Sequence, residues 1–240
     1  MSDSQPSAVS GKDFIVGQVA RELAAAIGPQ HVSRDPETLQ RHAADWSWSS
    51  KYMQHVGLDV PAAQISVSPG TSEEVERVVE IASDHRIPIT TRGGGSGTQG
   101  GTLALYGGIS LDLSRLDRIV DIDEESLAVT VEAGLEGPIL ERTLNERGLT
   151  LAHYPGSYHL GATIGGYLAA RGSGVVSTKY GKAEDQVLQV EVVTPPGKTF
   201  RTLPVPSHAS GPDLLQLVVG SEGPLGVITQ ATMRLEHLPE

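Results

Sequence analysis

The densest chemical signal in the sequence is a glycine loop at residues 93–101. Six of its nine residues are glycine, and it follows a stretch, residues 86–91, that predicts a buried strand. Glycine lets successive backbone N–H groups turn toward one point and lets a ligand approach the main chain closely. Ser96 and Thr98 could add hydroxyl donors, and Arg92 a positive charge. The loop indicates an anion or nucleotide site, with a pyrophosphate as the usual ligand.

Other interpretations of this loop fit less well. A flexible linker between two domains also favours glycine and serine, but strand patterns bracket the loop and no polar spacer follows it. A Walker A motif would end with Gly-Lys-Ser/Thr, which is absent from this loop. The Rossmann fingerprint would continue into a helix, whereas strand patterns follow here.

Two further segments could meet this loop. In residues 155–166 small residues again expose the backbone, and residues 163–166 suit a helix N-terminus aimed at a ligand. Close packing of a glycine-rich helix on a sheet explains Gly165 and Gly166 about equally well. The third segment, residues 220–229, taken alone is a turn entering a strand, with Glu222 as a solvated turn carboxylate.

Composition narrows the class of protein. The chain has 240 residues, 38% of them hydrophobic, which is enough for one large core or two modest ones. A net charge of −11 argues against nucleic-acid partners. The absence of cysteine excludes disulfides, thiolate metal sites and cysteine nucleophiles. No apolar run is long enough to span a bilayer, and the polar N-terminus lacks a signal-peptide core, so we expect a cytoplasmic protein.

The elements that must position the three segments mix helices and strands. Apolar spacing predicts a helix over residues 14–27. A short helix is expected to start at Asp35-Pro36-Glu37, and another after the capping box of Thr71 and Glu74. Residues 45–61 show no period and are expected to form a loop. The fold class is α+β, with a disordered N-terminus (residues 1–12), a small βαβ-type lobe (residues 13–92) and a second lobe of mixed sheet with helices (residues 93–240).

In this order the motifs resemble the FAD-binding domain of the vanillyl-alcohol oxidase/p-cresol methylhydroxylase superfamily. The resemblance runs from about Val9 to Leu238 and is carried by residues 61–101, 154–166, 170–187 and 211–229. The most similar members are FAD-linked oxidases: glycolate oxidase flavin subunit, D-lactate dehydrogenase and alkyldihydroxyacetonephosphate synthase. The sequence of residues 171–174 is slightly more similar to that of the synthase type. The resemblance implies a p-cresol methylhydroxylase-type FAD-binding domain of two α+β lobes, without the cap domain that usually follows.

The resemblance also implies where FAD is held. The first loop would wrap the pyrophosphate, the second would lie along pyrophosphate, ribityl chain and flavin, and the third would offer main-chain contacts. The implied cofactor-binding residues are Thr91, Arg92, Gly93, Gly94, Gly95, Ser96, Gly97, Thr98, Pro155, Gly156, Ser157, Thr163, Gly165, Gly166, Arg171, Ser173, Glu222, Gly223, Gly226, Val227 and Ile228.

Three departures from the family pattern bear on these assignments. The second loop is one residue longer than usual, which affects residues 158–162. Pro224 replaces a common threonine and so removes a hydroxyl and a backbone donor. Some members attach FAD through a histidine in the first loop, which has none here, so we expect non-covalent FAD.

The implied activity is that of an FAD-dependent oxidoreductase, with hydride transfer from a 2-hydroxy acid or related alcohol to flavin N5. A synthase-like flavin transferase domain and a cap-less fragment, inactive alone, are the alternatives. Expected partners are FAD, a small-molecule substrate, and a cap domain or partner subunit, with no metal and no nucleic acid. No catalytic residue is assigned. His153, Tyr154, Tyr158 and His159 could face the flavin, although packing of the loop by its own aromatic rings explains each of them.

Overall fold

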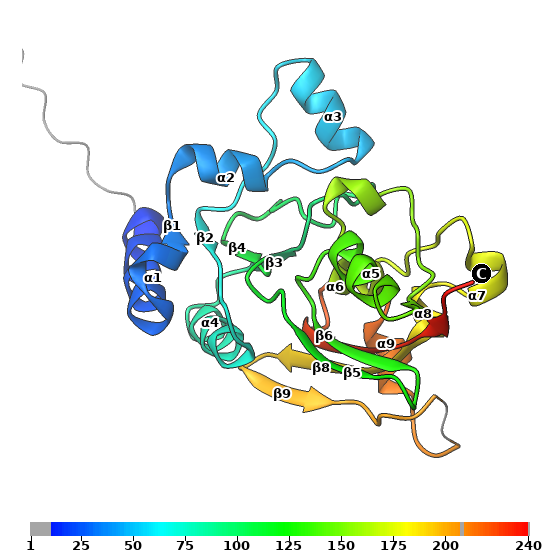
Figure 1. Ribbon diagram of the computed structural model, residues 1–240. Coiled ribbons are helices and arrows are strands. Elements are labelled where there is room, and N and C mark those ends of the chain that lie inside the picture. Colours follow the sequence, from blue (N-terminus) through cyan, green and yellow to red (C-terminus); the bar gives the residue numbers. More distant parts are fainter. Residues whose placement is uncertain (1–10, 207–208, 240) are drawn as a thin grey trace, which may run out of the picture.

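The computed structural model describes residues 11–206 and 209–239 (Figure 1). The first half of the chain contains a four-stranded sheet. Its strand order is β1-β2-β4-β3, with β4 parallel to both β2 and β3. The strands are β1 (Val32–Ser33), β2 (Ile65–Val67), β3 (Ile89–Arg92) and β4 (Ile109–Asp112). β4 lies between β2 and β3, so this sheet extends beyond the lobe boundary expected at residue 93.

Two capped helices follow the predicted pattern. α2 (Pro36–His42) begins with Asp35 as its N-cap, and the Asp35 side chain accepts from the N–H of Thr38 at 2.8 Å. α4 (Ser72–Asp84) begins after Thr71, whose hydroxyl accepts from the N–H of Glu74 at 3.2 Å; the predicted capping box is formed only in part, because the Glu74 carboxylate accepts from the N–H of Gly70 (2.6 Å) and not from that of Thr71. α4 packs against α1 (Gly11–Ile27) and contacts β8 and β10 of the second sheet. Of the N-terminus expected to be disordered, residues 1–10 lie outside the described residues, and α1 begins at Gly11.

The expected loop over residues 45–61 is wrong in part, because α3 (Trp48–His55) forms there. Ser47 is its N-cap and accepts from the N–H of Ser50 at 3.2 Å. Only Ser50 of α3 is buried, so the helix has no apolar stripe for a periodicity argument to detect. Figure 1 shows α3 standing away from the two sheets.

The second sheet is antiparallel, with strand order β5-β6-β10-β8-β9. β8 and β9 form the hairpin predicted around residues 194–198, with Thr194 opposite Lys198. The strands are β5 (Ile119–Asp123), β6 (Ala128–Glu132), β8 (Val187–Thr194), β9 (Lys198–Arg201) and β10 (Val227–Arg234). α6 (Ile164–Ala169) packs on β6 and β10.

Short elements complete the second half. β7 (Leu149–Thr150) pairs with β11 (Glu236–His237). The remaining elements are η1 (Pro29–His31), α5 (Gly137–Asn145), η2 (Tyr158–Leu160), α7 (Ser177–Tyr180), α8 (Ala183–Gln186) and α9 (Leu214–Val218). Across the described ranges, no helix has the length and apolar character needed to cross a bilayer.

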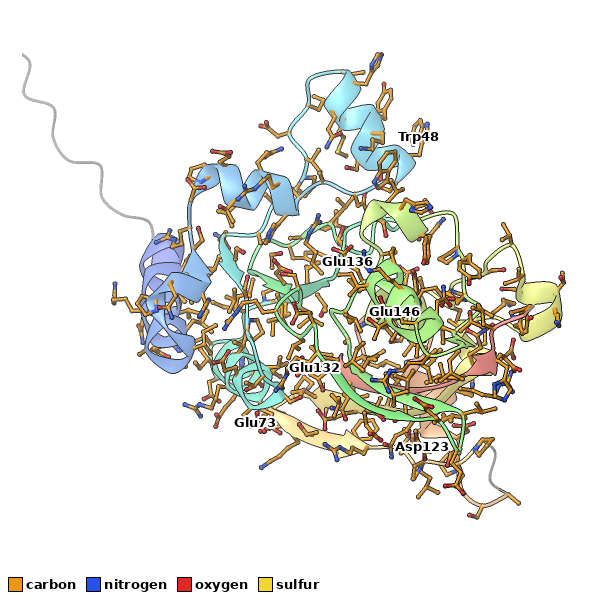
Figure 2. The ribbon with its side chains drawn as sticks, in the orientation of Figure 1. Trp48, Glu73, Asp123, Glu132, Glu136 and Glu146 are labelled. Atoms are coloured by element: carbon orange, nitrogen blue, oxygen red, sulfur yellow. The ribbon has the colours of Figure 1, made fainter. Side chains whose placement is uncertain are left out.

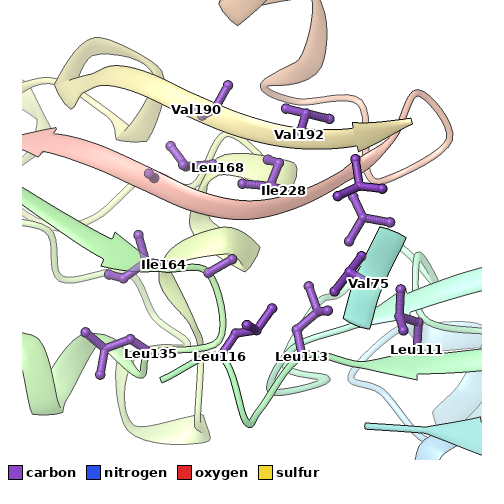
Figure 3. Packing of buried hydrophobic residues seen from close by; sticks show 14 of the residues in the cluster. Val75, Leu111, Leu113, Leu116, Leu135, Ile164, Leu168, Val190, Val192 and Ile228 are labelled. Atoms are coloured by element: carbon purple, nitrogen blue, oxygen red, sulfur yellow. The ribbon is translucent and has the colours of Figure 1, made fainter. Parts of the chain in front are cut away.

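One hydrophobic core runs through both sheets. Figure 3 shows Val75 of α4 beside Leu111 and Leu113, with Val192 and Ile228 on the strands across from it. All five side chains belong to the same buried cluster. Because the two halves share this core, loops that leave either half are held against the other.

A buried carboxylate fastens α4 to the second sheet. Glu191 is only 5% exposed. It accepts from the hydroxyls of Ser72 (2.6 Å) and Thr229 (2.7 Å), and from Nε of Arg201 (2.7 Å). Burial alone would raise the pKa of Glu191, but these hydrogen bonds and the Arg201 charge outweigh burial and lower the pKa.

Candidate cofactor site

A cavity of about 640 Å³ opens where the three glycine segments meet. This volume is in the usual range for small-molecule and cofactor sites. All of the residues expected to bind the cofactor line it, except Arg92 and Val227. Segments that are up to about 130 residues apart in sequence, from Gly97 to Ile228, therefore share one wall, as the resemblance implied.

The first loop has unpaired amides and lies on the wall of this cavity. Within the described chain, the N–H groups of residues 94–98 have no hydrogen-bond partner, and all five residues line the cavity. An added Cβ at Gly97 would meet no atom within 4 Å. Consecutive unpaired N–H groups around an open space form an anion-binding nest, because the positive ends of the amide dipoles converge.

The other side of the loop is closed by the second segment. A side chain at Gly94 would collide with the carbonyl oxygen of Gly161, and one at Gly93 with the hydroxyl of Thr163. Both glycines are therefore required by close packing of one loop on the other. This packing fixes the first loop, with its unpaired amides, beside the cavity.

Arg92, predicted to offer its charge to the ligand, does not line the cavity, and its guanidinium group is paired elsewhere. Its Nη1 donates to the carbonyl oxygens of His42 (3.1 Å) and Ala44 (2.9 Å). A side chain at Gly95, where φ is +64°, would collide with this guanidinium. Arg92 therefore fastens the end of α2 to the glycine loop.

The N-terminus of α6 is also less available than predicted. Its first three amides are already paired: Ile164 N–H with the Leu135 carbonyl (2.9 Å), Gly165 N–H with that of Ala133 (2.8 Å), and Gly166 N–H with the Thr163 hydroxyl (3.2 Å). A Cβ at Gly165 would lie 2.8 Å from that of Ala133, so Gly165 serves close helix–sheet packing. At Gly166 an added Cβ would meet only the Thr163 hydroxyl, at 3.2 Å, so this glycine leaves room on the cavity side.

The third segment is fixed by Arg171. Its Nε donates to the carbonyl of Val219 (2.9 Å) and its Nη2 to that of Gln216 (3.0 Å), at the end of α9. Arg171 lines the cavity, but these guanidinium N–H groups are directed at protein carbonyls. Val227 is buried in the β10–β8 pairing opposite Val193 and does not reach the cavity.

The departures from the family pattern leave the cavity wall largely unchanged. Pro224 is exposed and is not part of the wall, so the missing hydroxyl and amide fall outside it. The longer second loop forms η2 and the turn at Gly161, and within residues 158–162 only Leu160 and Ala162 line the cavity.

None of the four side chains considered for catalysis lines the cavity. The Tyr154 hydroxyl donates to the Glu141 carboxylate at 2.6 Å, and burial together with this hydrogen bond raises the pKa of Tyr154 to about 12. Tyr158 packs against the rings of Tyr154 and His159. The structure agrees with packing of the loop by its own rings.

His153 is 2% exposed, and its two ring nitrogens have no partner among the described residues. Its ring packs edge-on to Tyr167, with 4.6 Å between ring centroids. Burial lowers the pKa of His153 to about 4, although the charge of Glu184 opposes the shift. The imidazole is therefore neutral at pH 7.

A pH-dependent stability follows from this shift. Because the unfolded chain binds a proton near pH 6.5 and the folded chain does not, the stabilisation is complete above pH 6.5 and is lost as the pH falls toward 4. Chemical denaturation at several pH values should show a steeper loss of unfolding free energy for the parent than for His153→Phe. Equal slopes would contradict a neutral buried histidine.

Several cavity residues were missed from sequence. Helical spacing could have identified two of them, because Ala169 and Ala170, at the end of α6, follow the predicted residue Gly166 at intervals of three and four. Trp46 gave no such signal, since it precedes α3 in a stretch without periodicity. The missed lining residues are Trp46, Gln99, Gly101, Thr102, Leu113, Ala133, Leu160, Ala162, Tyr167, Ala169, Ala170, Gly172 and Ser221.

The residues present fit a dinucleotide. Free amides at residues 94–98 suit a pyrophosphate, and backbone from the other two segments extends the site on either side. Neither histidine nor cysteine occurs among the described residues of the wall. No group of three or more potential metal ligands gathers anywhere in residues 11–206 and 209–239.

Comparison with known proteins agrees with this geometry. Residues 63–203 match the family described as FAD binding domain. A mitochondrial D-lactate dehydrogenase [cytochrome] of Arabidopsis thaliana is 32% identical over 99% of this chain and 42% of its own length. A solved structure of alkyldihydroxyacetonephosphate synthase superposes with a TM-score of 0.85 at 29% identity, over 100% of this chain and 42% of that one. For p-cresol methylhydroxylase the TM-score is 0.80 at 23% identity, over 98% and 45%, which shows the shared fold.

The chain thus spans less than half the length of these proteins. The α+β architecture expected from the sequence, that of a p-cresol methylhydroxylase-type FAD-binding domain, is confirmed. The chain belongs to the FAD-binding domain family.

Proposed function

We propose that FAD lies non-covalently in the cavity, with its pyrophosphate on the free amides of residues 94–98. The observation that carries this proposal is the run of five unpaired N–H groups on the cavity wall. Such donors bind a dianion through local dipoles, which suits a chain with a net charge of −11. The ribityl chain and flavin would then follow the backbone of residues 155–157 and 171–173, and Ile228 would close the wall.

Titration with FAD tests the binding. The purified chain should take up added FAD and quench or shift its visible flavin spectrum at about one equivalent. A chain that stays colourless after gel filtration with excess FAD would refute this site.

The non-covalent attachment has its own test. The described cavity wall offers no histidine or cysteine as a nucleophile, and the one tyrosine on it, Tyr167, is buried with its hydroxyl directed at Gly137. Acid precipitation of the FAD-loaded protein should therefore release all the flavin into the supernatant. Flavin that remains with the denatured pellet would contradict this prediction.

We infer that the chain serves an oxidoreductase that acts on a 2-hydroxy acid or a related alcohol. The likeness to a D-lactate dehydrogenase over 99% of the chain supports this substrate class. Bound FAD supplies a hydride acceptor at flavin N5. The residues of this chain bind and orient the cofactor, and Glu222 is the only carboxylate on the described wall. We therefore propose that a cap domain or partner subunit binds the substrate and supplies the base.

A synthase-like reaction is the second candidate, and the TM-score of 0.85 with alkyldihydroxyacetonephosphate synthase favours it. The two candidates differ in net electron transfer. Under anaerobic conditions and with the cap domain or partner subunit present, a 2-hydroxy acid such as D-lactate should bleach the bound flavin if the oxidoreductase assignment holds. Exchange of an acyloxy group for an alkoxy group, with release of the carboxylic acid and without net bleaching, would support the synthase type instead.

A further inference from the structure

Trp46 is the exposed aromatic ring on the cavity wall. Of the described residues that line the cavity, only Trp46 and Tyr167 carry a large aromatic ring. Tyr167 is 3% exposed, whereas Trp46 is 50% exposed. An indole left half in water beside a binding cavity keeps a large apolar surface that a planar ligand could cover.

The backbone of Trp46 is fixed to the first glycine loop. Its N–H donates to the carbonyl of Gly97 at 3.0 Å, next to the free amides. On the N-terminal side, Arg92 holds the carbonyls of His42 and Ala44. The backbone that carries the ring is therefore fixed beside the unpaired amides of the first loop.

The residues on each side of Trp46 are buried while its ring is not. Asp45 and Ser47 are both 2% exposed, and Oδ1 of Asp45 accepts from the N–H (3.0 Å) and the hydroxyl (2.6 Å) of Ser47. This arrangement belongs to a built turn rather than to a loose loop. The ammonium of Lys51 lies 4.5 Å from the centroid of the Trp46 ring, in a cation–π contact.

We propose that Trp46 packs against one of the two planar heteroaromatic rings of FAD, adenine or isoalloxazine. The inference rests on the proposed function, because it takes FAD as the ligand of the cavity. FAD joins two planar rings to a pyrophosphate, so a ring must lie on each side of the amides that hold the pyrophosphate. Trp46 lies beside those amides and exposes a matching surface. It precedes residues 63–203, which match the family, so the match assigns it no role.

Equilibrium titration of the full chain with FAD tests this contact. Trp46→Ala should raise the Kd for FAD roughly 5- to 100-fold, the range expected for the loss of one aromatic stacking contact. Trp46→Phe keeps a ring and should recover most of the affinity. Trp48→Ala is the matched control, because Trp48 is the only other tryptophan, is 77% exposed and lies on α3 (Figure 2) outside the cavity wall. Its Kd should stay within about two-fold of the parent's, since single exposed apolar side chains rarely matter.

Two more measurements separate the contact from its alternatives. Lys51→Gln removes the ammonium but keeps the indole, so its FAD affinity should match the parent's; a loss equal to that of Trp46→Ala would assign the effect to charge and overturn the proposal. ADP and FMN, used as probes, show which ring is covered. Trp46→Ala weakens ADP binding if the ring is adenine and FMN binding if it is isoalloxazine.

The possible failures are distinguishable. If the parent chain takes up no FAD, both the proposed function and this inference fail. If the parent binds FAD and Trp46→Ala binds it within two-fold, only the role of Trp46 is refuted. The melting temperature of ligand-free Trp46→Ala should equal the parent's, because the ring is half exposed; a large decrease would indicate a structural role and refute the contact.

Discussion

Gly94→Ala is expected to weaken FAD binding by about 100-fold or more, because two charge-assisted hydrogen bonds to the pyrophosphate would be lost. The new methyl group would collide with the carbonyl oxygen of Gly161, which belongs to the backbone and cannot rotate away. The first loop must therefore move off the second, and its amides would no longer converge. Overpacking of this kind costs about 1–3 kcal/mol, so the melting temperature should also fall by about 3–10 °C. Isothermal titration with FAD and thermal unfolding without FAD would measure the two effects.

Gly97→Ala is the matched control for this substitution. The same methyl group meets no atom within 4 Å at Gly97, so the ligand-free protein should melt within about 2 °C of the parent, as expected for a substitution without a clash. Loss of FAD affinity in Gly97→Ala without loss of stability would locate the ligand on the open side of the loop. If Gly94→Ala bound FAD within two-fold of the parent, the packing of the two loops would not be what positions the amides.

Glu191→Gln is expected to destabilise the fold by about 2 kcal/mol at pH 7, since it weakens three hydrogen bonds to a buried carboxylate. These bonds connect α4 to three strands of the second sheet, so the loss should appear as a single lowered unfolding transition. Glu124→Gln is the control, because Glu124 and its partner Arg147 are both at least half exposed, and such pairs contribute about 0–1 kcal/mol.

The difference between parent and Glu191→Gln should depend on pH. Because folding lowers the pKa of Glu191 below its ordinary value of 4.5, the stabilisation is present above that pH and is lost as the pH falls through the folded pKa. Urea unfolding at pH 7 and pH 4 would measure it. A difference that stays constant or grows on acidification would contradict the proposed hydrogen bonding of the ionised form.

Local patterns predicted much of this structure. The caps of Asp35 and Thr71, the β8–β9 hairpin and the glycine segments are encoded within a few residues, so their spacing was sufficient. The likeness to a family then implied that the three segments share one site, and they line one cavity. Binding by these particular residues, the lobe boundary at residue 93, and a cytoplasmic location stay predictions.

Long-range partners account for what the sequence did not predict. Arg92 and Arg171 stand in the glycine segments, but their guanidinium groups bind carbonyls of residues 42, 44, 216 and 219, which no local pattern connects to them. The N-terminus of α6 was expected to face a ligand, with close packing as an equal alternative for Gly165 and Gly166, and the carbonyls of residues 133 and 135 occupy two of its amides. α3 was missed because only one of its residues is buried, which leaves no periodic signal.

The occupied arginines also have a consequence for solution behaviour. At 0.1 M salt, dissolved ions largely screen the attraction between full charges that are more than about 10 Å apart. The interaction between an amide dipole and a phosphate oxygen acts only at contact distance. Nη1 of Arg92 and Nε and Nη2 of Arg171 donate to protein carbonyls, and the unpaired N–H groups of the first loop, where we propose that the pyrophosphate binds, are uncharged. FAD affinity in this protein should therefore change little with ionic strength, so the cofactor would stay bound over a wide range of salt concentrations.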